Sequence, residues 1–124
     1  SAFGYAVYPD VTKGGLGIGA ANGSGVVFED GRAVGFSTLT QVTLGAQIGG
    51  QSFSEVVFFE NADSFGKFKA GTTEFAANAS AVASSSGAAA SNDYKGGVAV
   101  FVIPRGGLMA EASVGGQKFT FRPK

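Results

Sequence analysis

The stretch GLMAEASVGGQKFTFRPK, residues 107–124, contains a change of phase that decides how the chain must fold. Even positions hold Leu108, Ala110, Ala112 and Val114, whereas Phe119 and Phe121 occupy odd positions. Successive side chains of a strand point to opposite faces, so an apolar set changes face only where a residue is added or the chain bends. Gly115 and Gly116 lie at the change, and glycine is well suited to a bulge or corner. The pattern predicts a sheet that bends here.

Beyond the two glycines, the solvent-facing row of the last strand becomes basic. At about 3.3 Å per residue it spans roughly 20 Å. The row consists of Lys118, Thr120, Arg122 and Lys124.

Strand-like alternation also fills the first half of the chain. A first strand is expected from residue 2 to the turn at Pro9-Asp10. The dipeptides Asn22-Gly23 and Asp30-Gly31 each have the form of a two-residue type I′ turn. Glu29 and Arg32 would face each other across the second turn. Three antiparallel strands follow, the last continuing through residues 38–50.

The middle of the chain predicts a central strand and a short helix. QSFSEVVFFE, residues 51–60, has four consecutive apolar residues, typical of a strand covered on both faces. In NADSFGKFKAG, residues 61–71, Asn61 can cap a helix, Phe65 and Phe68 share a face, and Gly71 supplies a left-handed stop.

Two later segments are expected to be strands. In residues 72–91, alanine favours a helix, but the apolar row at period two that begins at Phe75 favours a strand, which we expect. Its small side chains would admit another backbone or leave room for a ligand chain, and the sequence leaves both open. Residues 96–116 predict a hairpin that turns at Pro104 and the glycines after it. The whole predicts a mainly β protein: a single curved antiparallel sheet or barrel-like domain of about six to eight strands with one short helix.

Composition limits the classes of function. A chain of 124 residues is expected to form a single domain over residues 1–124. Nine basic residues balance nine acidic ones, so no overall field attracts nucleic acid, and we expect no nucleic-acid partner. There is neither Cys nor His, which excludes disulfides, thiolate chemistry and imidazole catalysis. No apolar run approaches the roughly 20 residues of a spanning helix, so we expect no transmembrane segment.

Candidate catalytic motifs are weak. Ser64 and Lys67 form an S-x-x-K pattern, but the later S-N-D at residues 91–93 and K-G-G at residues 95–97 depart from the companions that serine acyl-transferring enzymes carry. The carboxylates, Glu55 among them, form no D-x-D or E-x-x-E constellation and are expected at the surface or in turns. The glycines of residues 14–25 fit neither nucleotide-binding fingerprint. We expect no catalytic residue, no metal site and no cofactor.

Residues 4–60 and 94–123 together closely resemble the SYLF domain family. The most specific pieces are Lys13-Gly14-Gly15, the GAQIG sequence of residues 45–49 and the GLMA sequence of residues 107–110. The resemblance covers nearly the whole chain. It implies binding of anionic phospholipids, phosphoinositides or phosphatidic acid among them, and in fungal members also of filamentous actin, without established catalysis.

The resemblance also implies a setting. Family members usually carry an amphipathic, partly basic segment ahead of the position of Ser1, which this sequence lacks. The pattern is similar to that of the bacterial branch, whose members often have an export signal or a lipid-anchored cysteine, and Ser1 would then begin a trimmed mature domain. The expected location is the bacterial cell envelope, periplasmic or associated with the outer membrane as a peripheral protein.

Two hypotheses of function follow. In the first, the chain is a non-enzymatic domain that binds anionic phospholipid membranes, with head-group phosphates held by Lys13, Arg105, Lys118 and Arg122. In the second, it is a protein-interaction module for an envelope partner or an actin-like filament, and lipid contact is incidental.

Overall fold

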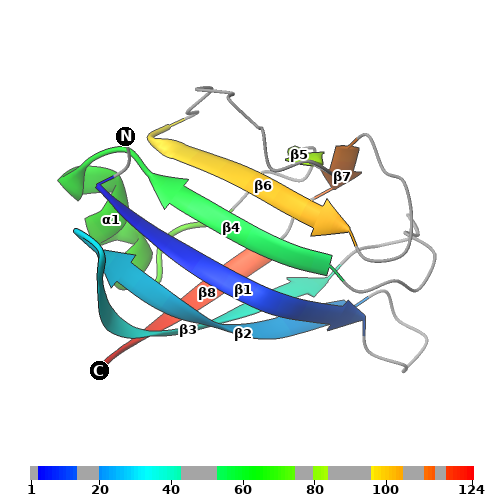
Figure 1. The fold of residues 1–124 in the computed structure, drawn as a ribbon, viewed down its shortest axis with the longest axis horizontal. Coiled ribbons are helices and arrows are strands. Elements are labelled where there is room, and N and C mark those ends of the chain that lie inside the picture. Colours follow the sequence, from blue (N-terminus) through cyan, green and yellow to red (C-terminus); the bar gives the residue numbers. More distant parts are fainter. Residues whose placement is uncertain are drawn as a thin grey trace.

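The structure of the chain, a computed structural model, describes residues 3–13, 20–42, 53–74, 80–83, 96–104, 111–113 and 117–124. These residues form eight strands and one helix, and the strands belong to one sheet of order β7-β5-β6-β4-β1-β2-β3-β8 (Figure 1). In chain order the elements are β1 (Gly4–Lys13), β2 (Ala20–Glu29), β3 (Arg32–Val42), β4 (Phe53–Phe59), α1 (Ala62–Lys69), β5 (Ser80–Ala83), β6 (Val98–Pro104), β7 (Glu111–Ser113) and β8 (Gln117–Pro123).

The predicted fold class is confirmed. Six consecutive strands of the sheet, from β6 to β8, pair antiparallel, and the strand of residues 51–60 is central as expected. One pair differs, because β5 runs parallel to β6 while pairing antiparallel with β7. Of the predicted strand in residues 72–91, the structure describes β5 and residues 72–74, and the rest lies outside the described residues.

Of the two predicted type I′ turns, one is confirmed and one is wrong. Asp30 and Gly31 have φ values of 54° and 77°, and Glu29 pairs with Arg32 across the turn. Asn22-Gly23 is no turn, since β2 continues through it. A Cβ at Gly23 would lie 2.8 Å from the carbonyl oxygen of Asp10 on β1. Glycine is therefore needed there for close approach of two backbones, which its dipeptide pattern does not distinguish from a turn.

The predicted end of the first strand at Pro9-Asp10 is also wrong. β1 continues to Lys13, and its pairing with β2 and β4 is irregular around these two residues. The hydroxyl of Ser54 donates to the carbonyl oxygen of Pro9 at 2.7 Å. Proline lacks the donor of a regular ladder, so the strand bulges here instead of ending.

The predicted hairpin of residues 96–116 is wrong, because β5 lies between β6 and β7. β7 and β8 pair at opposite ends of the strand order, so the change of phase is a corner between two strands. Residues 114–116, on which the predicted bend falls, lie outside the described residues. The predicted row beyond it is confirmed: Gln117 and Phe119 are buried, whereas Lys118, Thr120, Arg122 and Lys124 are exposed.

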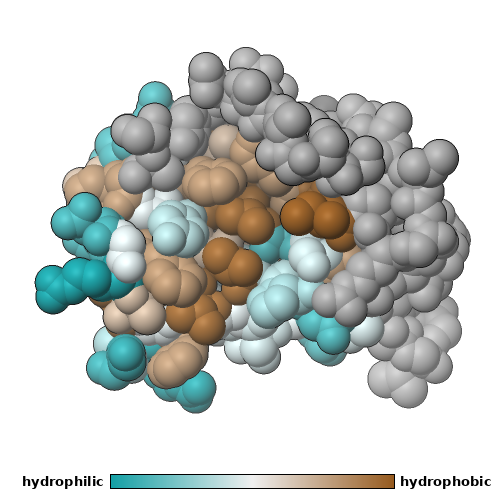
Figure 2. Space-filling view, in the orientation of Figure 1, coloured by the Kyte–Doolittle hydropathy of each residue, from teal (hydrophilic) through white to brown (hydrophobic). Residues whose placement is uncertain are grey.

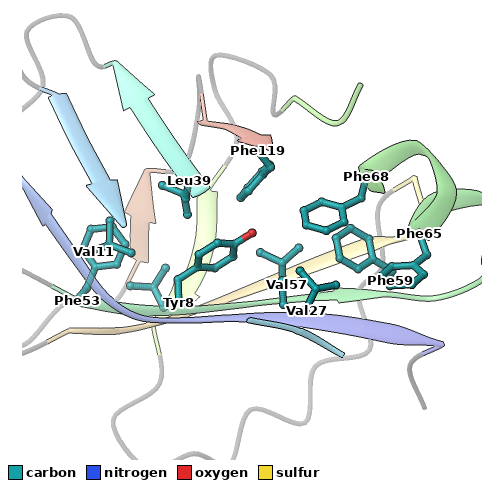
Figure 3. Packing of buried hydrophobic residues seen from close by; sticks show 12 residues of the cluster. Tyr8, Val11, Val27, Leu39, Phe53, Val57, Phe59, Phe65, Phe68 and Phe119 are labelled. Atoms are coloured by element: carbon teal, nitrogen blue, oxygen red, sulfur yellow. The ribbon is translucent and has the colours of Figure 1, made fainter. Parts of the chain in front are cut away.

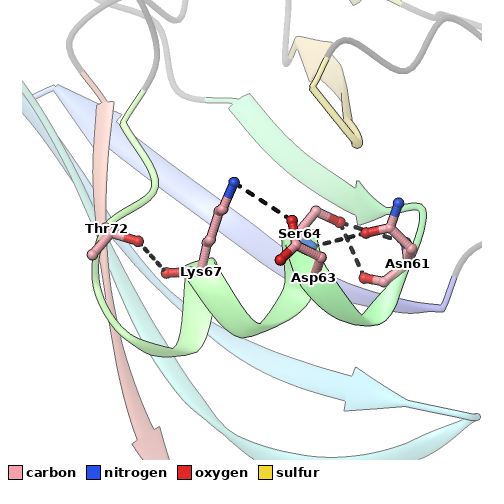
Figure 4. A network of polar contacts seen from close by, with 5 residues as sticks. All are labelled: Asn61, Asp63, Ser64, Lys67 and Thr72. Atoms are coloured by element: carbon pink, nitrogen blue, oxygen red, sulfur yellow. Dashed lines mark hydrogen bonds and ion pairs between the residues drawn. The ribbon is translucent and has the colours of Figure 1, made fainter.

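The helix prediction is confirmed in its cap, face and stop. The backbone N–H of Ser64 donates to Asn61 Oδ1 at 2.9 Å, and Gly71 has a φ of 77° (Figure 4). Phe65 and Phe68 pack on Phe59 of β4, with ring centroids 5.5 and 4.6 Å away. The helix thereby covers the inner face of the sheet near one end.

The core lies between that helix and the inner face of the curved sheet (Figure 3). The ring of Phe68 lies 5.8 Å from that of Phe119, which brings α1 against β8 as well as β4. Buried members of the core are Ala6, Tyr8, Val11, Val27, Leu39, Phe53, Val57, Phe59, Phe65, Phe68, Val102 and Phe119.

Candidate functional site

Two of the four predicted head-group residues lie on the same surface. Lys118 and Arg122 are exposed on the outer face of β8, four residues apart and therefore about 13 Å apart along the strand. Lys13 lies at the end of β1, which two strands separate from β8, and its side chain lies outside the described residues. Arg105 also lies outside them.

An exposed aromatic side chain completes this surface. Register places Phe36 of β3 opposite Arg122, Thr38 opposite Thr120 and Thr40 opposite Lys118. The backbone N–H of Thr38 donates to Thr120 Oγ1 at 3.1 Å, which ties the two strands at the middle of the surface. Phe36 is 42% exposed. We name this surface the β3–β8 patch, made of Phe36, Thr38, Thr40, Lys118, Thr120 and Arg122.

Sequence reasoning missed Phe36, although a signal was present. In β3 the even positions from 36 to 40 alternate with the buried odd positions Ser37, Leu39 and Gln41. Phe36 therefore falls on the side of the two threonines, the polar side. An exposed aromatic ring opposite an arginine is a candidate contact residue, because aromatic residues and arginine are enriched in interfaces.

The cations of the patch are available for binding. Among the described residues, neither Lys118 nor Arg122 forms an ion pair, whereas Lys67 pairs with Asp63 at 3.5 Å and Lys69 pairs with Glu29 at 3.9 Å. The backbone of Glu74 forms an isolated bridge with Lys118, which places an acidic residue beside that lysine. Arg122 is therefore the stronger of the two candidate anion contacts.

A second surface is apolar. A row of aromatic rings crosses the outer face of β2, β1, β4 and β6: Tyr5 stacks on Phe28 at 5.0 Å, Phe58 lies 6.0 Å from Tyr5, and Phe101 meets Phe58 edge-on at 5.5 Å. These rings are half-buried, and Ile103 beside them is 42% exposed. Figure 2 shows the apolar side chains gathered on this face.

The aromatic row and the β3–β8 patch face opposite ways. Gln117 on the inner side of β8 hydrogen-bonds Glu55 on the inner side of β4, across the interior. The outer sides of β4 and β8 therefore point away from each other, and in Figure 1 β8 lies behind β4 and β1. One flat membrane or partner surface cannot engage both at once.

The expectation that Glu55 lies at the surface or in a turn is wrong. Its side chain is fully buried, because it shares the inward-facing positions of β4 with Phe53, Val57 and Phe59. Gln117 Nε2 donates to Glu55 Oε1 at 2.9 Å and to Gln41 Oε1 at 3.2 Å. The alternation of buried and half-buried positions along β4 places residue 55 on the inner face, so the sequence did contain a signal for the burial of Glu55.

Burial shifts the protonation of this interior. It raises the pKa of Glu55 to about 8, and the hydrogen bond from Gln117 acts in the opposite direction with a smaller effect. Burial also raises the pKa of Tyr8 well above its usual range, against the effect of its 2.7 Å hydrogen bond with Ser37, and the charge of Glu55 adds to the rise.

The S-x-x-K residues have structural roles. Ser64 closes the capping box with Asn61, since its hydroxyl oxygen accepts from the Asn61 backbone N–H at 3.4 Å, and Lys67 is paired with Asp63 (Figure 4). Within the described ranges, no group of three or more metal-ligating side chains is found. None of the helices described there is long and apolar enough to cross a membrane.

Comparison with known proteins identifies a relative that matches this chain over part of its own length. No family model matches the chain. A protein named Beta cell expansion factor A, from Aeromonas veronii, is 31% identical to it over 121 residues. The match covers 95% of this chain and 45% of that protein, so the chain spans less than half the length of this relative. The likeness concerns the matched part of the relative.

Proposed function

We propose that this chain is a SYLF-type domain of the bacterial cell envelope that binds anionic phospholipid surfaces, without catalysis, through the β3–β8 patch. The observation that carries the proposal is Phe36, exposed on the outer face directly opposite Arg122, which has no ion-pair partner among the described residues. A guanidinium binds phosphate oxygens in a bidentate manner. An aromatic ring beside it suits the boundary between head groups and acyl chains.

The expected attachment is weak and sensitive to salt. A basic residue near an anionic membrane contributes about 1 kcal/mol, and Lys118 and Arg122 together about 2 kcal/mol. The Debye length falls from about 10 Å at 0.1 M salt to about 3 Å at 1 M, so exposed cations lose most of this attraction. Insertion of Phe36 would add an apolar contribution that salt does not screen.

Vesicle flotation of matched charge-reversal variants tests the proposal. The Lys118→Glu/Arg122→Glu variant is compared with Arg32→Glu/Lys67→Glu, which changes the net charge equally at two exposed sites away from the patch. The wild type is expected to float with acidic vesicles at low salt. With neutral vesicles it should remain unbound at the bottom of the gradient. Affinity should fall by about thirtyfold or more in the patch variant, because about 2 kcal/mol of attraction is lost.

The control decides between a site and a general charge effect. It should stay within about threefold of the wild type if binding is local to the patch. Equal losses in both variants, or none in the patch variant, would remove the β3–β8 patch from the binding surface.

A protein-interaction module is the second candidate, and the aromatic row favours it. Among the described residues, the four rings and their neighbour Ile103 present an uncharged face, the composition of the centre of a protein interface. The test is cosedimentation with actin-like filaments for the wild type, Ile103→Glu and the patch variant. Loss of binding in Ile103→Glu alone would support this candidate, and no sedimentation of the wild type would exclude such filaments.

A further inference from the structure

One hydrogen bond ties two strands that are not neighbours in the sheet. β4 and β8 are separated by β1, β2 and β3, yet Gln117 Nε2 reaches Glu55 Oε1 at 2.9 Å. Both side chains are fully buried. The bond therefore crosses the interior and holds the curved sheet closed at this level.

In the part of the chain that the structure describes, two oxygens of the pair have no hydrogen-bond partner, Glu55 Oε2 and Gln117 Oε1. Both are acceptors if Glu55 is ionised, so neither can satisfy the other, and a buried unpaired acceptor is strongly unfavourable. A carboxylic acid and a primary amide can instead pair through two hydrogen bonds, one N–H to carbonyl and one O–H to carbonyl. A single proton on Glu55 Oε2 supplies the donor that both oxygens lack.

The groups that face Glu55 give no reason for it to be charged. Its register partners are Tyr8 of β1 and Val102 of β6, and Gln117 of β8 connects it to Gln41 of β3. Tyr8 is the titratable member of this set, and burial keeps its phenol protonated. No Lys or Arg among the described residues forms an ion pair with Glu55.

We propose that Glu55 is held as the neutral acid, that its proton closes the contact between β4 and β8, and that loss of this proton at alkaline pH opens the contact. The pair is then a latch that responds to pH. Because Gln117 is followed directly by Lys118, opening the latch also loosens the strand that carries the basic row. The contact between Glu55 and Gln117 does not depend on whether the outer surface binds a membrane or a protein.

The sign of the pH dependence follows from the raised pKa. Burial raises the pKa of the Glu55 carboxyl from its ordinary value of 4.5 to about 8 in the folded chain. Between these values the unfolded chain has released a proton that the folded chain keeps, so stability falls as pH rises through this window. The stabilisation that the Glu55 proton contributes is fully present below about pH 4.5 and is lost as the pH rises through about 8. The folding equilibrium constant should fall by about a thousandfold across the window.

Two measurements on the 124-residue chain test the latch. Urea unfolding from about pH 5 to 9 compares the wild type with Glu55→Gln, which keeps the shape without the titration, and with Glu60→Gln, an exposed control at the end of β4. The wild type and Glu60→Gln should show the fall, and Glu55→Gln should lack it. Identical profiles for wild type and Glu55→Gln would overturn the proposal.

Infrared spectroscopy reads the proton directly. At about pH 6 the wild type should show the carbonyl band of a protonated carboxylic acid, absent from Glu55→Gln, and the band should disappear with a midpoint near pH 8. This titration needs only the wild type if Glu55→Gln does not fold. Absence of the band at about pH 6 would mean that Glu55 is ionised and that the latch does not exist.

Discussion

At the scale of single residues, close contact between neighbouring strands fixes which side chains are tolerated. A Cβ at Gly25 of β2 would lie 2.5 Å from both the Val7 carbonyl oxygen and the Tyr8 ring. Tyr8 cannot easily move aside, because its hydroxyl is hydrogen-bonded to Ser37 within the core. Glycine at this position is therefore a requirement of packing.

Gly25→Ala is expected to destabilise the protein by roughly 1–3 kcal/mol, since the added methyl overlaps a backbone oxygen that has nowhere to go. Gly66→Ala is the matched control: nothing lies within 4 Å of its Cβ position, and alanine is the better helix former by about 1 kcal/mol. Urea unfolding should move the two midpoints in opposite directions. Equal effects would mean that the Gly25 site is looser than the structure indicates.

The same scale shows what residue patterns could and could not predict. Period-two alternation correctly placed Lys118 and Arg122 on the exposed face of β8. The same alternation in β3 and β4 exposes Phe36 and buries Glu55, whereas residue type alone suggests the reverse for each. Asn22-Gly23 was misread because a turn and a close backbone approach both require glycine.

At the scale of elements, the helix depends on its cap as well as on its two phenylalanines. It has eight residues, too few to be stable alone, and two backbone N–H groups at its start, those of Asn61 and Ser64, are satisfied by each other's side chains. Its local signals lie within eleven residues of sequence, and for that reason the helix was predicted correctly in cap, face and stop.

Asn61→Ala should destabilise the protein by about 1 kcal/mol, because the N–H of Ser64 loses its acceptor. Asn61→Asp keeps an acceptor at the positive end of the helix dipole and should stay within about 0.5 kcal/mol of the wild type. Thermal unfolding followed by circular dichroism compares the three. A loss in the aspartate variant as large as in the alanine variant would mean that the cap is not what Asn61 contributes.

Strand partners were harder to predict than strands. The hairpin of residues 96–116 was expected from Pro104 and its glycines, yet β5 pairs with both β6 and β7. A parallel partner comes from a distant part of the chain, so no local turn signal announces it. The alternating Ala-rich stretch predicted that a strand is present but not which strands it pairs with.

At the scale of the whole molecule, curvature separates three regions that a flat sheet would not separate. From one face of the protein to the other, these regions are the aromatic row, the interior pair Glu55–Gln117 and the β3–β8 patch. The phase change between Val114 and Phe119 predicts a bend whose residues lie outside the described ones, while β7 and β8 on either side of it belong to opposite ends of the sheet. It did not predict that the bend would turn the basic row away from the aromatic one, because that depends on contact between β4 and β8 through the core.

The measurement that tests the proposed membrane surface most directly is the depth of single tryptophans in acidic vesicles. The chain contains no tryptophan, so Phe36→Trp, Phe3→Trp and Ile103→Trp each give one reporter at a site that is about 40% exposed. Quenching by lipids brominated on their acyl chains reports insertion. We expect quenching and a blue shift for Phe36→Trp and neither for the other two. Quenching at Ile103→Trp with none at Phe36→Trp would place the membrane on the aromatic row and not on the β3–β8 patch.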